Sequence, residues 1–155
     1  MINMKLSYKS MNIVYTVSGS GPDVIFIHGW AGSRLHWSQA SSQIINRRLW
    51  ALDMIGFGDS DNPIKNMEIT DHVELISHFI SKQNIKNLVL VGHSMGGQVA
   101  ANYTITHSSS VSRIILIEAT VGEELRKLTM PILLIFGAPE TTIFNVRKNF
   151  KTVNK

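Results

Sequence analysis

Residues 88–99 read LVLVGHSMGGQV, an apolar run that ends in Gly-His-Ser-Met-Gly at 92–96. The apolar part is typical of a strand buried on both faces, and residues 97–106 are typical of a helix. Gly-x-Ser-x-Gly is a weak motif by itself. Between a strand and a helix, however, it predicts a serine on a strained turn that lifts its Oγ clear of the sheet. We therefore predict that Ser94 is a nucleophile, which needs a base to accept its proton.

Strand and helix patterns alternate along the rest of the chain. The predicted strands cover 6–8, 12–17, 23–28, 48–53, 87–91, 113–118 and 131–136, and the predicted helices cover 33–46, 69–81, 97–106 and 143–153. The first two strands indicate a hairpin, and the others a parallel sheet with helices on both faces. We expect one α/β domain over residues 1–155. Chemistry in such sheets lies in loops at the carboxyl ends of the strands, where three motifs of this chain fall.

The first of these motifs, HGWAG at 28–32, predicts one half of an oxyanion hole. Gly29 allows a sharp turn, so that the backbone N–H of Trp30 can point at an anionic oxygen beside the N–H of Met95. His28 ends a buried strand, where a histidine is more often a hydrogen-bonded structural residue than a proton shuttle. We place it with Gly29 among the oxyanion and substrate-binding residues.

The second motif, DMIGFGDS at 53–60, matches a phosphate-binding loop only in part. The third glycine of Gly-x-Gly-x-x-Gly is missing because Asp61 stands in its place. The stretch also follows the fourth strand rather than the first. We interpret it as a tight structural loop and not as a nucleotide site.

The net charge of +4 does not indicate a nucleic-acid partner, because the excess lies at the end of the chain. All acidic residues lie before position 141, as do all basic residues except Arg147, Lys148, Lys151 and Lys155. A short basic end is usually a solvated surface. The sequence has no cysteine, no apolar leader and no apolar run of about 18 residues. We expect a cytoplasmic protein with no membrane partner and no metal site.

In this order, HGWAG, LDMIGFGDSDNP and LVLVGHSMGG resemble the α/β-hydrolase superfamily over about Asn12 to Gly137. HGWAGSRLHW is similar to the corresponding stretch of pimeloyl-acyl-carrier-protein methyl ester esterases, within the branch of small carboxylesterases. The resemblance implies a Ser–acid–His triad in that chain order, a helical lid after the sixth strand, and no cofactor. A serine at the elbow argues against the dehalogenase and epoxide-hydrolase relatives, for which the resemblance would imply an aspartate.

The chain departs from the family pattern at the lid and at the acid. Only TVGEELRK, residues 120–127, stands where the lid should lie, so we expect a lid reduced to these residues. The family acid normally follows the seventh strand in a Gly-x-x-Asp turn, and Glu140 stands at that position. Glu118, at the end of the sixth strand, is a second candidate. Either carboxylate could orient an imidazole, and the sequence leaves both open.

The base is the largest departure from the pattern. The family histidine follows an eighth strand, and this chain stops after the helix predicted at 143–153. We therefore expect a sheet truncated after its seventh strand and the following helix, with the base not in this chain. Among the histidines present, His36 is the least unfavourable base, because it comes just after the oxyanion loop. The others are less suitably placed: His28, His72, His78, His93 and His107.

These features favour a serine hydrolase of carboxylic esters or thioesters, acting on a small-molecule substrate through an acyl-Ser94 intermediate. The alternative is a non-catalytic binding module or a degraded fragment of an α/β-hydrolase. The apolar strand PILLIF at 131–136 has no predicted partner on its outer edge. We also expect self-association there, unless another segment covers that edge.

Overall fold

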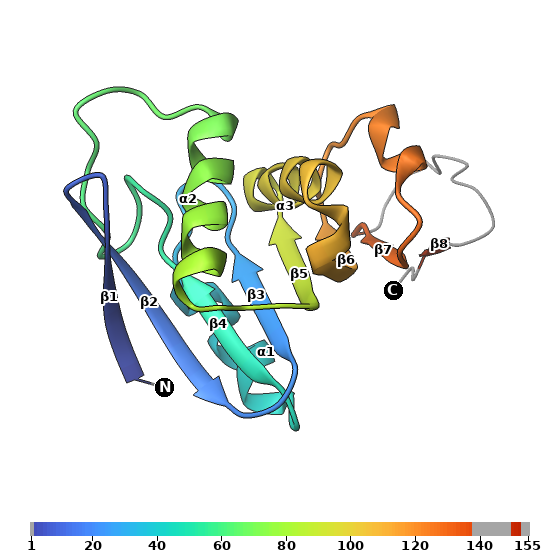
Figure 1. Ribbon diagram of the computed structural model, residues 1–155, viewed down its shortest axis with the longest axis horizontal. Coiled ribbons are helices and arrows are strands. Elements are labelled where there is room, and N and C mark those ends of the chain that lie inside the picture. Colours follow the sequence, from blue (N-terminus) through green and yellow to red (C-terminus); the bar gives the residue numbers. More distant parts are fainter. Residues whose placement is uncertain (1, 138–149, 153–155) are drawn as a thin grey trace.

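Eight strands form one sheet in the order β1-β2-β4-β3-β5-β6-β7-β8 (Figure 1). The computed structural model describes residues 2–137 and 150–152. β1 pairs antiparallel with β2, and β2 with β4, whereas every other neighbouring pair is parallel. The predicted α/β class with a mostly parallel sheet and an opening hairpin is therefore confirmed. The strands are β1 Ile2–Tyr8, β2 Met11–Gly19, β3 Asp23–Ile27, β4 Arg48–Leu52, β5 Leu88–His93, β6 Val111–Ile117, β7 Ile132–Ile135 and β8 Phe150–Thr152.

Helices cover both faces of this sheet, with α2 and α3 on one face and α1 on the other (Figure 1). Their bounds are α1 Ser38–Gln43, α2 Ile69–Lys82 and α3 Met95–Thr106, and three short 3-10 helices are η1 Arg34–Trp37, η2 Ser108–Ser110 and η3 Glu123–Lys127. Alternate residues of β3 supply the two cores, because successive side chains of a strand point to opposite faces. Ile25 and Ile27 pack in the larger core together with α2 and α3, and Phe26 stacks on Trp37 in the smaller one.

The helix predicted at 33–46 is shorter than expected. Ser33 caps its start as predicted, because its Oγ accepts a hydrogen bond from the N–H of Leu35. The segment then forms η1 and the short α1. Of the expected apolar stripe only Trp37 is buried, whereas Leu35 and Ile45 are exposed, so the stripe does not face the core.

The end of the chain differs from the expected helix. Residues 150–152 form β8, which pairs in parallel with β7 from Ile132 to Leu134. The helix predicted at 143–153 is therefore wrong at these three residues, whose backbone joins the sheet instead. β8 also covers the outer edge of β7 over this stretch, which is the exception stated with the expected self-association; self-association itself stays a prediction.

The connection between β6 and β7 is as short as the sequence predicts. Within residues 120–127 it contains η3 and no helix longer than that. Among the residues described, no helix is both long and apolar enough to cross a membrane.

Candidate active site

Ser94 occupies the turn between β5 and α3, and its backbone is strained. Its φ and ψ angles are 50° and −117°, a combination that non-glycine residues rarely adopt. The conformation is held from both sides, because Ser94 N donates to the carbonyl of Ile117 at 2.9 Å and Ser94 O accepts from Gly97 N at 2.9 Å. This is the geometry that the sequence predicts for a nucleophilic serine.

Three glycines allow the backbone around Ser94 to pack this closely. A Cβ at Gly92 would lie 2.3 Å from the carbonyl oxygen of Gly96, and one at Gly96 would lie 2.3 Å from that of Ile27. A Cβ at Gly97 would lie 2.3 Å from the Cβ of Ala119. Real Cβ atoms do not approach other atoms so closely, so each position requires glycine.

The HGWAG loop packs directly against this turn. A Cβ placed on Gly29 would lie 3.1 Å from Ser94 Cβ and 2.7 Å from His93 Nδ1. Covalent geometry then places Trp30 N at most about 7 Å from Ser94 Cβ. Met95 is the first residue of α3, so its N–H has no acceptor within the helix. Within the described ranges, neither the Trp30 N–H nor the Met95 N–H donates to another group. This arrangement is consistent with the predicted oxyanion role of the two donors, which stays a prediction.

His28 holds the HGWAG loop to the chain after β4. Its ring is fully buried, its Nε2 accepts from Met54 N at 3.0 Å, and its Nδ1 lies 2.7 Å from the carbonyl of Gly29. Burial lowers the pKa of His28, so the ring is neutral at pH 7 and Nδ1–H donates to Gly29 O. Because backbone groups engage both nitrogens, the ring positions Gly29 and Trp30.

Asp53 fixes the loop that follows β4. Its buried carboxylate accepts from Arg34 N at 2.6 Å and from Asp59 N at 2.9 Å, and it pairs with the buried Arg34 guanidinium. The guanidinium also reaches the exposed Asp59 at 2.8 Å. At Gly58, with φ 58°, a Cβ would fall 2.3 Å from Asp53 Cγ. The loop closes around an internal carboxylate, which confirms a tight structural loop.

Of the two candidate acids, Glu118 lies within the described residues. Glu140 lies outside the described residues. Glu118 directly follows β6, has φ 48°, and donates its N–H to Ile135 O at 2.9 Å. Its carboxylate Oε1 accepts a hydrogen bond from Gly137 N, so it holds the turn after β7. The choice of acid stays open.

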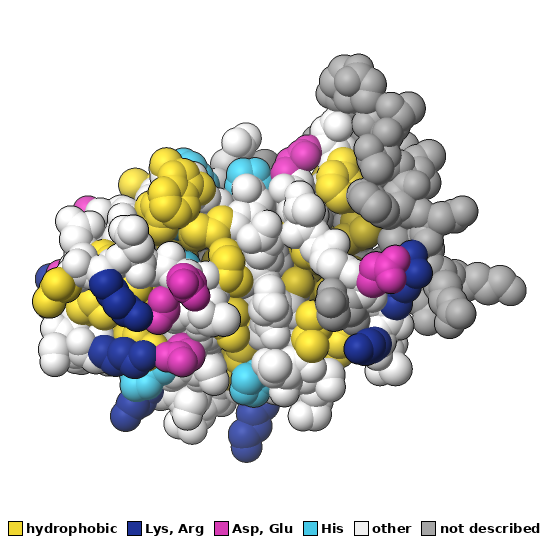
Figure 2. All heavy atoms as spheres, turned by 90° about the horizontal axis from the view of Figure 1, so that it is seen from above, with side chains coloured by type: hydrophobic (Ala, Val, Ile, Leu, Met, Phe, Trp, Pro, Cys, Tyr) yellow, Lys and Arg dark blue, Asp and Glu magenta, His cyan; other side chains and the backbone are white. Residues whose placement is uncertain are grey.

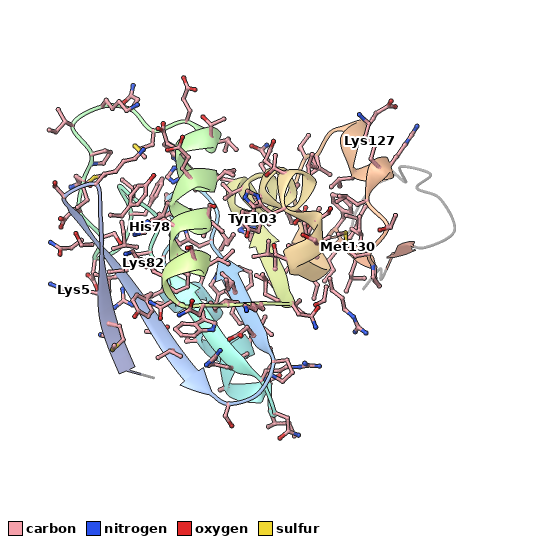
Figure 3. All side chains as sticks on the ribbon, viewed as in Figure 1. Lys5, His78, Lys82, Tyr103, Lys127 and Met130 are labelled. Carbon is pink, nitrogen blue, oxygen red and sulfur yellow. The ribbon has the colours of Figure 1, made fainter. Side chains whose placement is uncertain are left out.

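All six histidines lie in the part of the chain that the structure describes, and none of them hydrogen-bonds Ser94 there. His28, His36 and His93 line a cavity of about 220 Å³ together with Trp37 and Ile117. His107 stacks on Tyr103, which lies on α3 (Figure 3), with ring centroids 4.3 Å apart. Within the described residues no group of three or more His, Cys, Asp or Glu side chains could hold a metal ion.

His72 lies close to the HGWAG loop, although the two are far apart in the sequence. The ring is 2% exposed and lies 6.3 Å from the ring of Phe57, which in turn packs 5.2 Å from the indole of Trp30. The available signal was its position in the first turn of the helix after β4, because such a turn lies near the carboxyl end of the strand before it.

Comparisons with known proteins agree with this geometry. The family model of the alpha/beta hydrolase fold matches residues 22–145, and the chain belongs to this family. The chain is 29% identical over 119 residues to a candidate 2-succinyl-6-hydroxy-2,4-cyclohexadiene-1-carboxylate synthase of Bacillus subtilis (strain 168), covering 73% of this chain and 43% of that protein. It is 33% identical over 108 residues to the probable lysophospholipase BODYGUARD 4 of Arabidopsis thaliana, covering 66% and 26%.

Among solved structures, a membrane phospholipase A described as a bacterial virulence factor has a TM-score of 0.86 at 18% identity, covering 99% of this chain and 77% of that chain. At this identity the likeness shows the fold alone. The chain spans less than half the length of the two curated relatives named above.

Proposed function

We propose that the chain carries the nucleophile and oxyanion hole of a serine hydrolase that cleaves carboxylic esters or thioesters. The observation that carries the proposal is the backbone of Ser94, held at φ 50° at the start of α3 and packed against Gly29. Strain of this kind persists only where the surroundings enforce it, and it is concentrated at functional sites.

In the proposed reaction, Ser94 Oγ attacks the carbonyl carbon of the ester. The carbonyl oxygen becomes an anion and accepts hydrogen bonds from the N–H groups of Met95 and Trp30, which together contribute several kcal/mol at the transition state. The positive end of the α3 dipole stabilises the same charge. The alcohol or thiol leaves, and water then hydrolyses the acyl-Ser94 intermediate. An imidazole within about 3 Å of Oγ must take the serine proton and deliver it to the leaving group.

The relatives support acyl chemistry in general terms. One of the curated relatives is named a probable lysophospholipase, a name that denotes cleavage of a lysophospholipid. The small carboxylesterase branch, which the stretch at 28–37 resembles, is part of the same proposal.

A second candidate is a binding module that keeps the pocket without the chemistry. It is favoured by one observation: Ser94 Oγ has no hydrogen-bonded histidine among residues 2–137 and 150–152. The two candidates differ in the reactivity of the serine, because only an activated serine reacts rapidly with a fluorophosphonate.

The test is fluorophosphonate labelling of the 155-residue chain, after circular dichroism has shown that it is folded. We expect slow labelling that Ser94→Ala abolishes, whereas Ser42→Ala, which alters an exposed serine of α1, leaves it unchanged. Hydrolysis of short p-nitrophenyl esters should fall far below about 10 s⁻¹. A site without its base retains only about 10³–10⁴-fold catalysis over water.

A second arm appends a loop with Gly-His from a relative after Lys155, since β8 already forms on β7. This graft should raise both labelling and turnover. If the unmodified chain labels rapidly at Ser94, the base lies within it and His36→Ala is the next variant. A folded graft whose Ser94 stays unreactive would refute the hydrolase proposal in favour of the binding module.

A further inference from the structure

A second pocket, of about 340 Å³, lies between the HGWAG loop and the chain that joins β4 to α2. This volume is within the range of small-molecule sites, about 300–1,000 Å³. Figure 2 looks onto the carboxyl ends of β3 and β5, and hydrophobic side chains gather on its left, the side of the loop before α2 in Figure 1. Six apolar side chains line the pocket: Trp30, Ile55, Phe57, Pro63, Ile64 and Met67.

Two of these side chains are unusually exposed. Trp30 is 73% exposed, and Ile64 is fully exposed, at 108% of the reference exposure of an isoleucine residue. Covering apolar surface of this size lowers the free energy of the protein in water. Both side chains stand at one pocket, so a single apolar ligand can cover them together.

The pocket also contains a polar group that lacks a partner. His72 lines it and is 2% exposed, yet its Nδ1 has no hydrogen-bond partner among the described residues. Burial lowers the pKa of His72, so the ring is neutral at pH 7 and offers one donor and one acceptor nitrogen. A buried nitrogen without a partner is unfavourable, and an oxygen on a ligand can satisfy it.

Trp30 connects this pocket to the reactive serine. Its backbone nitrogen lies within about 7 Å of Ser94 Cβ, and its indole forms a wall of the pocket. A substrate whose carbonyl lies at Ser94 can therefore extend one arm past Trp30 into the pocket.

We infer that this pocket binds the aliphatic arm of the ester, and that His72 hydrogen-bonds an oxygen carried on that arm. That the ligand is part of an ester rests on the proposed function. Binding itself requires no catalysis, so it can be tested separately. The arm is either the alcohol side or the acyl side of the ester, which hexanol and hexanoate represent.

Quenching of tryptophan fluorescence by iodide measures occupancy of the pocket. Trp37 and Trp50 are buried, so iodide reaches mainly Trp30. In a Ser94→Ala background, which prevents turnover, we expect hexanol or hexanoate to protect Trp30 in a saturable way. The probe that protects identifies the arm. No saturable protection by either probe would overturn the inference, whatever the labelling of Ser94 shows.

Two pairs of variants locate the bound probe. Ile64→Ser should weaken binding about threefold, whereas Ile45→Ser, which alters an exposed isoleucine that does not line the pocket, should not. His72→Leu should weaken binding of the ω-hydroxylated form of that probe (1,6-hexanediol or 6-hydroxyhexanoate), whose second oxygen lies on the arm, about three- to tenfold, and should leave binding of the probe without this oxygen unaffected.

The control for His72 is His78→Leu. His78 also has a buried nitrogen without a partner among the described residues, but it lies on α2 beside the β1–β2 hairpin (Figure 3), where it packs on Tyr8. This variant should bind as the parent does. Equal effects at both histidines, or at both isoleucines, would mean that the probe binds elsewhere and would refute the assignment.

Discussion

Two loops, at the carboxyl ends of β5 and β4 on either side of β3, keep their shapes by different forces. Around Ser94 the main chains pack so closely that only glycine fits between them, and this close packing holds the turn. Around Asp53, the chain closes on a buried carboxylate, and the turn is held by charge and hydrogen bonds. The first loop should therefore be intolerant of added volume, and the second of a lost charge.

The largest expected effect is that of Gly96→Ala. The new Cβ would meet the carbonyl oxygens of Ile27 and His28 at 2.3 and 2.5 Å, so the strand or the helix must move. We expect a loss of more than about 4 kcal/mol in the free energy of unfolding, which leaves little folded protein.

Gly56→Ala, in the Asp53 loop, is its control. Its φ is +84°, but the added Cβ would meet Pro63 at 3.4 Å, an ordinary contact. The cost should be the backbone strain alone, about 1–2 kcal/mol by urea unfolding. Similar losses of stability at both glycines would mean that close packing does not make the Ser94 turn less tolerant of added volume than the Asp53 loop.

The next effect is that of Asp53→Asn. It leaves the buried Arg34 guanidinium without its buried counter-charge, and we expect a loss of about 3–5 kcal/mol in urea unfolding at pH 7. Asp59→Asn removes a carboxylate whose side chain is 70% exposed from the same guanidinium and should cost less than about 1 kcal/mol. If the two variants were equally stable, charge burial would not hold this loop.

The smallest effect is a pH dependence at the contact between the HGWAG loop and the Asp53 loop. Burial lowers the pKa of both His28 and His72 below the usual 6.5, so below that pH the unfolded chain binds protons that the folded chain does not. Stability should be fully present above about pH 6.5 and decline below it, by up to about 1.4 kcal/mol per pH unit for each ring.

Urea unfolding at pH 7.5 and 5.5 measures this decline. Protonated His28 could no longer accept from Met54 N, so the contact between the HGWAG loop and the Asp53 loop is the part that weakens. In His72→Leu the free energy of unfolding should decline less with falling pH, because one of the two rings is removed. A stability that stays constant between these pH values would contradict the account.

The parts of the site that depend on local backbone could be predicted from the sequence. Ser94, Gly29 and Trp30 follow strands whose apolar runs are unambiguous, and parallel strands bring such turns to one end of the sheet. The contacts that depend on tertiary structure could not. Arg34 and Asp53 are 19 residues apart, and nothing in the pattern pairs them. The helical spacing around Phe150 misled, because periodicity cannot separate a short strand from a helix.

The place of β3 in the sheet has a consequence for how the chain folds. β3 lies between β4 and β5, and its pairing with β5 joins Val24 to Val89. The β1–β2 hairpin closes through a two-residue turn and can form in microseconds. The central pairing must instead close a long loop, which slows folding. Until β5 pairs with it, one side of β3 has no hydrogen-bonding partner, and an unpaired edge of a buried apolar strand favours aggregation.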